Sequence, residues 1–311
     1  MLDLSICVIT YNHEKYISKA LDSILMQKTN YSFEVLIADD CSTDNTPNIL
    51  KEYEERYPAF FQIIYRKKNM NKSNALITNG QELRRRAKGK YVINLEGDDY
   101  WINPNKINKQ IKFLNENCEY IAVGHDCYVV NGQSNITNEK YPTSKTKEYT
   151  LSNFISDQMP GQLATIMYRN PLYINSDHSI LEKKMIVGDQ VLVFWLALNG
   201  KIYVDNAKDS CYRHVTSGGS SFSATSTYSY EEWRRLYLEL LNFSKKYNHI
   251  DGVKYARVAL AKNLYRAIKL KKFSFHCFIE YLKDIKCSVF AIFDYIHYLC
   301  NKNILKKDLW L

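Results

Sequence analysis

Short apolar segments alternate with amphipathic segments over the first third of the chain, and this alternation restricts the possible folds more than any other feature. Four segments have the composition of buried strands, namely residues 4–10, 33–38, 61–66 and 91–95. Between them, apolar residues recur at the spacing of a helix that buries one face. Buried strands that alternate with helices predict an α/β fold with a mostly parallel central sheet and helices on its faces.

Three of these predicted strands are followed directly by polar residues. In sheets of this kind, ligands bind at the edge formed by the carboxyl ends of the strands. We therefore expect the three polar groups to line one crevice. They are Thr10, Tyr11 and Asn12 after the first strand, Asp39 and Asp40 after the second, and Glu96, Asp98 and Asp99 after the fourth.

Glu96, Asp98 and Asp99 surround a single glycine, Gly97, which lets the backbone turn closely. Carboxylate oxygens are the hard ligands that Mg²⁺ and Mn²⁺ prefer, usually while the ion is shared with the phosphates of a substrate. The cluster therefore predicts a divalent-cation site. Taken alone, it is equally compatible with an acidic turn on the protein surface.

Several other kinds of binding site lack their signatures. The turn after the first strand has no G-x-G-x-x-G pattern for a dinucleotide, and the chain has no phosphate loop of the G-x-x-x-x-G-K-S type. The eight cysteines are scattered without a C-x-x-C pair, which indicates reduced thiols rather than a zinc site or disulfides. Because we find neither a signal peptide nor an apolar window long enough to span a membrane, we expect a cytoplasmic protein.

The net charge of +9 is concentrated near the end of the chain, because residues 251–311 contain twelve Lys or Arg against five Asp or Glu. The nearly neutral remainder argues against a nucleic-acid partner. From residue 230 the pattern is helical, and its last segment carries an apolar stripe from Phe275 to Leu299. The stripe is compatible with packing inside the chain, with a homodimer interface, and with peripheral association with the inner face of the plasma membrane.

Three motifs, in this order and at these strand ends, resemble those of family 2 glycosyltransferases with the GT-A fold. The resemblance covers about residues 3–220, and it implies a GT-A catalytic domain at residues 1–225 followed by a helical region at residues 226–311. The motifs are Val8-Ile9-Thr10-Tyr11-Asn12, Ile37-Ala38-Asp39-Asp40-Cys41-Ser42-Thr43-Asp44 and Leu95-Glu96-Gly97-Asp98-Asp99-Tyr100-Trp101.

This resemblance implies an inverting hexosyl- or N-acetylhexosaminyltransferase of bacterial polysaccharide biosynthesis. Its donor would be a nucleotide diphosphate sugar, its acceptor a glycan or lipid-linked glycan, and its cofactor Mn²⁺ or Mg²⁺. Tyr11 matches a position where an aromatic ring stacks on the base, and Asp39 one that accepts a hydrogen bond from a base N–H, which favours a UDP-sugar. The positions that match nucleotide-sugar contacts are Thr10, Tyr11, Asn12, Asp39, Asp40, Glu96 and Asp98.

The same resemblance implies the metal ligands and the catalytic base. Glu96-Gly97-Asp98 stands where the family has its D-x-D motif, which implies metal coordination by Asp98 and Asp99 and leaves the role of Glu96 open. His214 matches a further contact to the metal or the diphosphate. Asp189 matches the base that takes the proton of the acceptor hydroxyl. Its place at the start of a helix would lower its pKa, so this role requires burial or a nearby group to offset the helix dipole, and a helix-capping aspartate is the alternative.

Two other functions are compatible with a sheet of this kind. A sugar-nucleotide pyrophosphorylase would need a glycine-rich loop with an arginine after the first strand, and residues 10–15 do not provide one. A non-catalytic glycan-binding or scaffold protein would have no need of the carboxylates, which are present in this chain.

Overall fold

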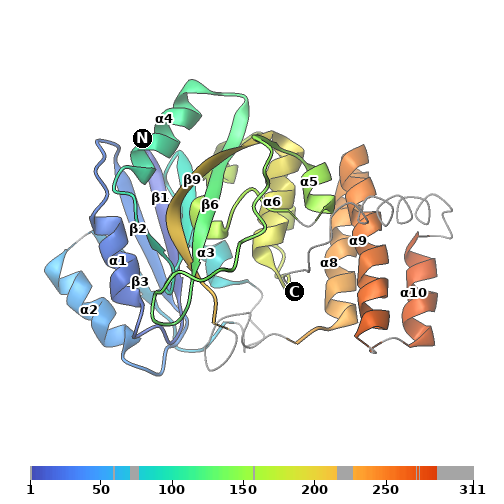
Figure 1. Ribbon diagram of the computed structural model, residues 1–311, viewed down its shortest axis with the longest axis horizontal. Coiled ribbons are helices and arrows are strands. Elements are labelled where there is room, and N and C mark those ends of the chain that lie inside the picture. The colour runs from blue at the N-terminus through green and yellow to red at the C-terminus, as the bar shows by residue number, and fades with distance from the viewer. Residues whose placement is uncertain are drawn as a thin grey trace.

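The computed structural model describes residues 2–58, 60–70, 77–156, 158–215, 227–270, 272 and 274–285. In these residues a central sheet carries helices on both faces, and three further helices extend the molecule to one side (Figure 1).

The first half of the sheet is parallel, as the sequence predicts. Its strands lie in the order β3-β2-β1-β4, and all three of their pairings are parallel. Thr10 pairs with Asp39, and Ile9 pairs with Glu96, so the polar residues that follow these strands emerge at one edge. The bounds are β1 (Leu4–Thr10), β2 (Phe33–Asp39), β3 (Phe61–Tyr65) and β4 (Tyr91–Glu96).

The second half of the sheet adds antiparallel pairs. Strand β8 (Met167–Arg169) lies antiparallel between β4 and β6 (Tyr120–Val130), and β9 (Lys201–Arg213) runs parallel to β6. Two short strands, β5 (Tyr100–Trp101) and β7 (Glu148–Tyr149), pair antiparallel with β9.

The sequence of this half also predicts strands at 162–168, 201–205 and 211–215 and a loop at 131–160, and the structure differs in each case. The sequence indicates separate strands at 201–205 and 211–215, but β9 is continuous, and bulges in its pairing with β6 accommodate the polar residues between them. The strand expected at 162–168 begins only at Met167. The residues before it form the 3₁₀ helix η1 (Leu163–Thr165), because the Gln162 side chain accepts a hydrogen bond from the Ala164 backbone N–H. The polar segment 131–160, predicted to be a loop, contains β7 and the helix α5 (Leu151–Ile155).

Alternating strand residues divide the core into two layers. Ile6 and Val8 of β1 face one layer, whereas Cys7 faces the other. The first layer is covered by α1 (Ile17–Leu25), α2 (Thr46–Arg56) and α4 (Lys106–Glu116). The second layer is covered by α3 (Asn79–Arg86), α5, α6 (Gly188–Asn199) and the short η3 (Ser179–Glu182), and η2 (Pro171–Tyr173) follows β8.

Two helix starts differ from the prediction. Thr46 was expected to cap α2, but Asn45 occupies the cap position and the Thr46 hydroxyl accepts a hydrogen bond from the His13 backbone N–H. Helix α3 begins at Asn79 rather than residue 74, because Thr78 forms a capping box with Gln81. Residues 74–76, the start of the helix predicted at 74–87, lie outside the described residues.

The C-terminal helices pack on the rest of the same chain. They are α8 (Tyr230–Lys246), α9 (Ile250–Lys269) and α10 (Phe275–Ile285). Trp233 and Leu236 of α8 and Tyr255 of α9 belong to the same apolar core as α6, and the Phe154 ring of α5 stacks on Tyr255 at 4.6 Å. Up to residue 285 the structure therefore agrees with packing inside the chain. The rest of the apolar stripe lies outside the described residues, and the dimer and membrane alternatives stay predictions.

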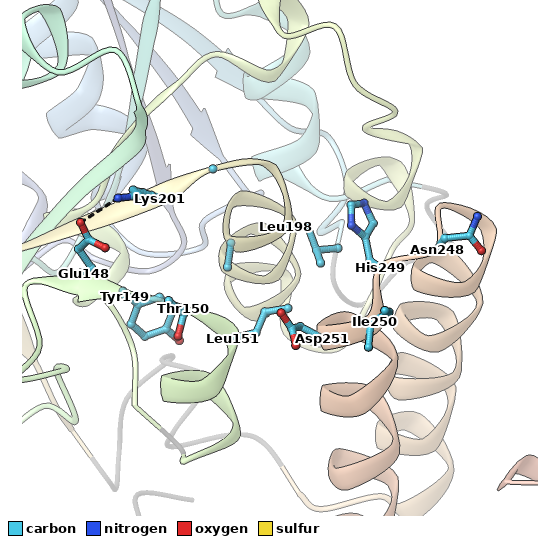
Figure 2. A pocket seen from close by; sticks show the side chains of 12 residues that line it. Glu148, Tyr149, Thr150, Leu151, Leu198, Lys201, Asn248, His249, Ile250 and Asp251 are labelled. Atoms are coloured by element: carbon cyan, nitrogen blue, oxygen red, sulfur yellow. Dashed lines mark hydrogen bonds and ion pairs between the residues drawn. The ribbon is translucent and has the colours of Figure 1, made fainter.

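A cavity of about 420 Å³ opens where α9 meets the sheet (Figure 2). Its lining includes Glu148 and Lys201, which form an ion pair of 3.1 Å, and Asp251 of α9. Lys201 is the first residue of β9, and the last residue of this strand, Arg213, bonds to Asp99. Because a strand rises about 3.3 Å per residue, the cavity lies roughly 30–40 Å from the acidic cluster. None of the helices among the described residues is both long and apolar enough to cross a lipid bilayer.

Candidate active site

The loops after β1 and β2 are joined by hydrogen bonds. The backbone N–H of Asn12 donates to the Ser42 hydroxyl at 2.9 Å, and the Asn12 side-chain oxygen accepts from the Thr43 backbone N–H at 2.8 Å. Asn12 has a φ of 55°, a left-handed conformation that asparagine tolerates better than most residues. These bonds hold the loop after β1 against the loop after β2, so the polar residues that follow the two strands lie together.

The predicted nucleotide-binding residues of these loops differ in accessibility. Tyr11 is half-buried, whereas Thr10 is fully buried with its hydroxyl 3.3 Å from His13 Nδ1. Asp39 accepts hydrogen bonds from the backbone N–H and the hydroxyl of Ser42. Burial raises the pKa of Asp39, and the bonds from Ser42 oppose that rise. Asp40 is buried and accepts a hydrogen bond of 2.7 Å from the Met70 backbone N–H.

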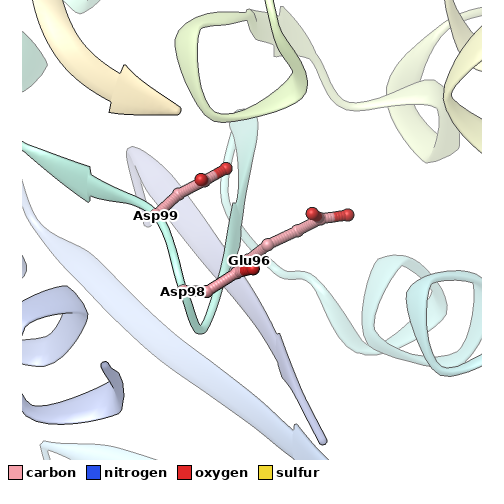
Figure 3. A group of neighbouring side chains, drawn as sticks. All are labelled: Glu96, Asp98 and Asp99. Atoms are coloured by element: carbon pink, nitrogen blue, oxygen red, sulfur yellow. The ribbon is translucent and has the colours of Figure 1, made fainter. Parts of the chain in front are cut away.

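Glu96, Asp98 and Asp99 form an acid turn at the carboxyl end of β4 (Figure 3). Each offers one carboxylate oxygen such that all three atoms lie within 4.8 Å of one another. The turn requires glycine at position 97, because a Cβ there would lie 2.7 Å from the Thr10 hydroxyl oxygen. The three carboxylates that the sequence places at this strand end therefore do lie close together in the structure.

Asp99 is held by protein groups on both of its carboxylate oxygens. Its Oδ1 accepts from the Arg213 backbone N–H at 2.8 Å, and its Oδ2 accepts from Gln162 Nε2 at 2.9 Å. Burial raises the pKa of Asp99, and the charges of Asp98 and Glu96 raise it further. Asp99 therefore supports the turn from within the protein, Asp98 is also buried, and Glu96 reaches solvent.

Arg213 fixes the back of the acid turn. Its buried guanidinium donates from Nε to the Asp98 carbonyl oxygen at 2.9 Å and from a terminal nitrogen to the Asn131 carbonyl oxygen at 2.6 Å. The guanidinium carbon lies 4.2 Å from the centre of the Tyr16 ring. One side chain therefore joins the acid turn to the segment that follows β6.

His13 lies between Thr10 and the acid turn. Its Nε2 is 3.8 Å from Asp98 Oδ2, on the opposite side of the ring from the Thr10 hydroxyl. Burial lowers the pKa of His13, although the nearby charge of Asp98 acts in the other direction. A neutral imidazole thus packs beside Asp98 without adding a positive charge to the turn.

Asp189 lies in the first turn of α6, close enough to Glu96 for its charge to raise the pKa of that carboxyl. Burial raises the pKa of Asp189, although hydrogen bonds from the backbone N–H groups of Gln190 and of Asp189 itself oppose the rise. The rise caused by burial counteracts the helix dipole, which lowers the pKa of a carboxyl at a helix N-terminus. A general base at this position requires such a counteracting effect. Desolvation, followed by the negative charges of Asp98 and Asp189, also raises the pKa of Glu96, although its side chain still reaches solvent.

His214 lies outside the carboxylate cluster among the described residues. Its Nδ1 is 2.7 Å from Glu139 Oε2, and its ring stacks on Tyr212 with the ring centres 6.1 Å apart. A contact of this nitrogen with a cation would require the bond to Glu139 to be exchanged. The glycine- and serine-rich segment that follows, 218–221, lies outside the described residues.

The residues present fit a divalent cation. Glu96 and Asp98 offer oxygen ligands, and within the described part of the chain neither side chain accepts a hydrogen bond of the kind that occupies Asp99. Three carboxylates this close together repel one another, and a cation would relieve that repulsion. Hard oxygen donors of this kind suit Mg²⁺ or Mn²⁺.

The central sheet, with helices on both faces, is that of the GT-A fold. Residues 5–172 match the sequence profile of the family described as glycosyl transferase family 2. The chain therefore belongs to glycosyl transferase family 2. This assignment favours the glycosyltransferase over the pyrophosphorylase among the functions compatible with the sequence.

Relatives from several bacteria match parts of the chain. An uncharacterized protein of Mycobacterium tuberculosis is 35% identical over 170 residues, which are 55% of this chain and 48% of that protein. The putative teichuronic acid biosynthesis glycosyltransferase TuaG of Bacillus subtilis is 29% identical over 222 residues, 70% of this chain and 81% of TuaG. The chain spans about half the length of its mycobacterial relatives.

Solved structures share the fold. The crystal structure of residues 1–349 of Staphylococcus aureus TarS in complex with UDP-GlcNAc matches with a TM-score of 0.62 at 23% identity, covering 96% of this chain and 80% of that chain. A crystal structure of GalNAc-T7 with UDP, GalNAc and Mn²⁺ matches with a TM-score of 0.51 at 12% identity, covering 69% of this chain and 44% of that chain. The fold is thus shared with proteins of very different sequence.

Two residues that contact the acid turn were not predicted from the sequence. His13 and Gln162 received no role, although both contact a residue of the acid turn. The position of His13, three residues after Thr10, was the only signal for it in the sequence. Nothing in the sequence connects Gln162 with Asp99, which lies 63 positions away.

Proposed function

We propose that the chain is a metal-dependent, inverting glycosyltransferase that moves a hexosyl or N-acetylhexosaminyl group from a UDP-sugar to a glycan or lipid-linked glycan. The observation that supports this most is the order of groups along the carboxyl edge of the sheet. The loops of β2 and β1 come first, the acid turn of β4 comes next, and the acid turn and Asp189 lie close enough for their charges to interact. A base, a diphosphate and a reacting sugar follow one another in the same order in a nucleotide sugar.

Each residue of the crevice has a role in this proposal. Tyr11 stacks on the base, and Asp39 accepts a hydrogen bond from the uracil N–H with lone pairs that Ser42 leaves free. Asn12 holds the two loops together, and the buried Asp40 fixes the second loop through Met70. The buried Thr10 acts by supporting the acid turn.

Asp98 and Glu96 would hold the cation, with Asp99 behind them and His214 as a further contact to the diphosphate. When bound, a divalent cation stabilises the negative charge that develops on the departing UDP. Asp189 takes the proton from the acceptor hydroxyl as that oxygen attacks the sugar carbon from the face opposite UDP, which inverts the configuration. Its raised pKa suits a group that must accept a proton.

The donor class is supported by the relatives. S. aureus TarS is a poly(ribitol-phosphate) β-N-acetylglucosaminyltransferase that is 27% identical over 266 residues, 81% of this chain and 43% of TarS, and it has been crystallised with UDP-GlcNAc. We extend the use of a UDP-sugar and of a polymeric, hydroxyl-bearing acceptor to this chain as part of the proposal.

A screen of nucleotide release tests this function. UDP-, GDP- and CMP-sugars are incubated with the purified protein, with Mn²⁺ or with EDTA, and we expect release from UDP-sugars in Mn²⁺ alone. Asp98→Asn should lower that rate by about 10²–10³-fold, since it removes a group that stabilises the transition state. Asp251→Asn, an exposed residue of α9, is the control. An unchanged rate in Asp98→Asn would refute the metal assignment, and release from no nucleotide sugar would refute the function.

A further inference from the structure

Two tyrosines from distant parts of the chain pack against each other and form a corner. Tyr141 belongs to the segment between β6 and β7, and Tyr212 lies near the end of β9. Their ring centres are 5.6 Å apart and their planes are nearly perpendicular, at 79°. Successive side chains of a strand point to opposite faces, so Tyr212 lies on the face opposite Arg213. Arg213 points to the back of the acid turn, and Tyr212 therefore lines the other side.

The carboxylates that influence the pKa of each tyrosine indicate which groups lie near this corner. Desolvation raises the pKa of Tyr141, and the largest electrostatic contribution comes from Asp189. Desolvation also raises the pKa of Tyr212, where the largest electrostatic contribution comes from Glu96. Because the backbone N–H of Arg213 bonds to Asp99, the preceding residue Tyr212 lies beside the acid turn, and the corner is near both the turn and the proposed base. A tyrosine hydroxyl is protonated and neutral at neutral pH.

The hydroxyl groups of both tyrosines are available to a ligand. Within the described residues, neither hydroxyl forms a hydrogen bond, and both side chains are half-buried. A phenol that is half-buried and has no hydrogen-bond partner among these residues can donate to and accept from a ligand that lies against it.

We propose that Tyr141 and Tyr212 form the wall of the donor-sugar subsite and contact the sugar ring of the nucleotide sugar. A sugar ring presents C–H groups that pack on an aromatic face and hydroxyls that exchange hydrogen bonds with a phenol. This inference rests on the proposed function and adds the residues that select the sugar.

The position of the corner favours the sugar over the other parts of the donor. The base is assigned to the loops of β1 and β2, on one side of the acid turn, whereas β9 lies across β4 on the other side. A diphosphate would require cationic groups or a metal, and the two phenols are neutral. The sugar is the part of the donor that lies beyond the diphosphate and next to the base Asp189.

Binding of UDP and of UDP-sugars separates this contact from the rest of the site. UDP, UDP-GlcNAc, UDP-glucose and UDP-galactose are titrated by calorimetry in Mn²⁺ into the wild type and into Tyr141→Phe, Tyr141→Leu, Tyr212→Phe and Tyr212→Leu. The Phe variants remove one hydroxyl and keep the ring packing, and the Leu variants also remove the aromatic face. We expect the affinity for UDP to stay within twofold, while the affinity for the preferred UDP-sugar falls about three- to tenfold in at least one variant of each tyrosine.

Tyr173→Phe is the matched control, because this exposed tyrosine of η2 bonds through its hydroxyl to Lys88, outside the crevice. The inference is overturned if the ratio of UDP-sugar affinity to UDP affinity is unchanged in all four variants. It is also overturned if UDP and UDP-sugar lose affinity equally, because the tyrosines would then act on the whole site. A wild type that binds none of the four nucleotides would overturn the proposed function together with this inference.

Discussion

The side-chain amide of Gln162 donates a hydrogen bond of 2.9 Å to Asp99, and both residues are buried. The orientation of this amide is fixed, because its oxygen accepts a second bond of 2.7 Å from the Ala164 backbone N–H. The N–H groups of Gln162 must therefore face Asp99. A neutral donor from η1 thus holds the innermost carboxylate of the acid turn.

Gln162→Leu should destabilise the protein by about 1–3 kcal/mol, because it leaves a buried carboxylate oxygen of Asp99 without a donor. Urea denaturation followed by circular dichroism measures this change. Gln133→Leu is the control, since Gln133 is exposed, and we expect it to stay within about 0.5 kcal/mol of the wild type. Equal urea midpoints for the two variants would show that the hydrogen bond from Gln162 to Asp99 contributes nothing to the stability of the protein.

Gly97→Ala should disturb the acid turn directly. A Cβ at this position would lie 2.7 Å from the Thr10 hydroxyl oxygen and 2.8 Å from His13 Nδ1, distances that real Cβ atoms essentially never show. His13 packs beside Asp98, so relief of the clash would move a proposed metal ligand. We expect a loss of about 1–3 kcal/mol in stability and a weaker affinity for Mn²⁺, which isothermal titration with Mn²⁺ and UDP measures.

Gly132→Ala provides the comparison for that measurement. The nearest atom to a Cβ at position 132 is the Tyr16 hydroxyl oxygen at 3.5 Å, an ordinary contact distance. This variant should keep the stability and Mn²⁺ affinity of the wild type. If Gly97→Ala also keeps the stability and the Mn²⁺ affinity of the wild type, the acid turn does not require glycine at position 97.

The activity should depend on pH through Asp189. A general base works only when ionised, and burial raises the pKa of this carboxyl. As the pH falls through that raised pKa, kcat should fall, and it should do so at a higher pH than the value of about 4 for an ordinary aspartate. The profile is measured with saturating Mn²⁺ and UDP-sugar, so that loss of the cation does not contribute.

Asp189→Ala distinguishes the base from a helix cap, because alanine can neither accept a proton nor cap a helix. As a base, Asp189 can be replaced without loss of donor affinity, while the transfer rate falls by about 10²–10⁴-fold. A cap that only supports α6 would instead lower the stability and the donor affinity together. Calorimetry with UDP and an assay of sugar transfer on the same preparation separate the two results.

The order of strands and helices was predictable, whereas several element boundaries were not. Residues 4–95 alternate cleanly because their strands are buried on both faces and their helices bury one stripe. Residues 206–210, which include Lys208 and Asp209, fall between two predicted strands, yet β9 is continuous and pairs with β6 on both sides of its bulges. Pairing with a neighbouring strand, which no local pattern reveals, decided that boundary.

The same distinction applies to the site. The acid turn was predictable because three carboxylates beside one glycine form a local pattern at a strand end. The partners of these carboxylates were not, because Gln162 and Arg213 reach the acid turn from elements far away in the sequence. Which donor satisfies a buried oxygen depends on the packing of the whole sheet.

Helix α10 depends on an arginine of α8, which gives a prediction for the helical region. Arg234 makes two hydrogen bonds to Asp284, at 2.6 and 2.7 Å, and a third of 2.9 Å to Glu280. A helix of 11 residues is marginal by itself, so α10 requires such contacts. Arg234→Leu should therefore cost α10 about 1–2 kcal/mol of local stability. Backbone amides at 277–284 should then exchange with deuterium about five- to 30-fold faster.

Arg235→Leu is the control for that exchange experiment, because Arg235 is the next residue of α8, is exposed and forms no ion pair with the described residues. Both variants lose one positive charge and gain one leucine, so a difference between them isolates the bonds to Asp284 and Glu280. Faster exchange confined to α10 in Arg234→Leu would show that the arginine holds this helix on the chain. Equal exchange in the two variants would instead assign the docking of α10 to its buried apolar residues, Cys277 and Tyr281.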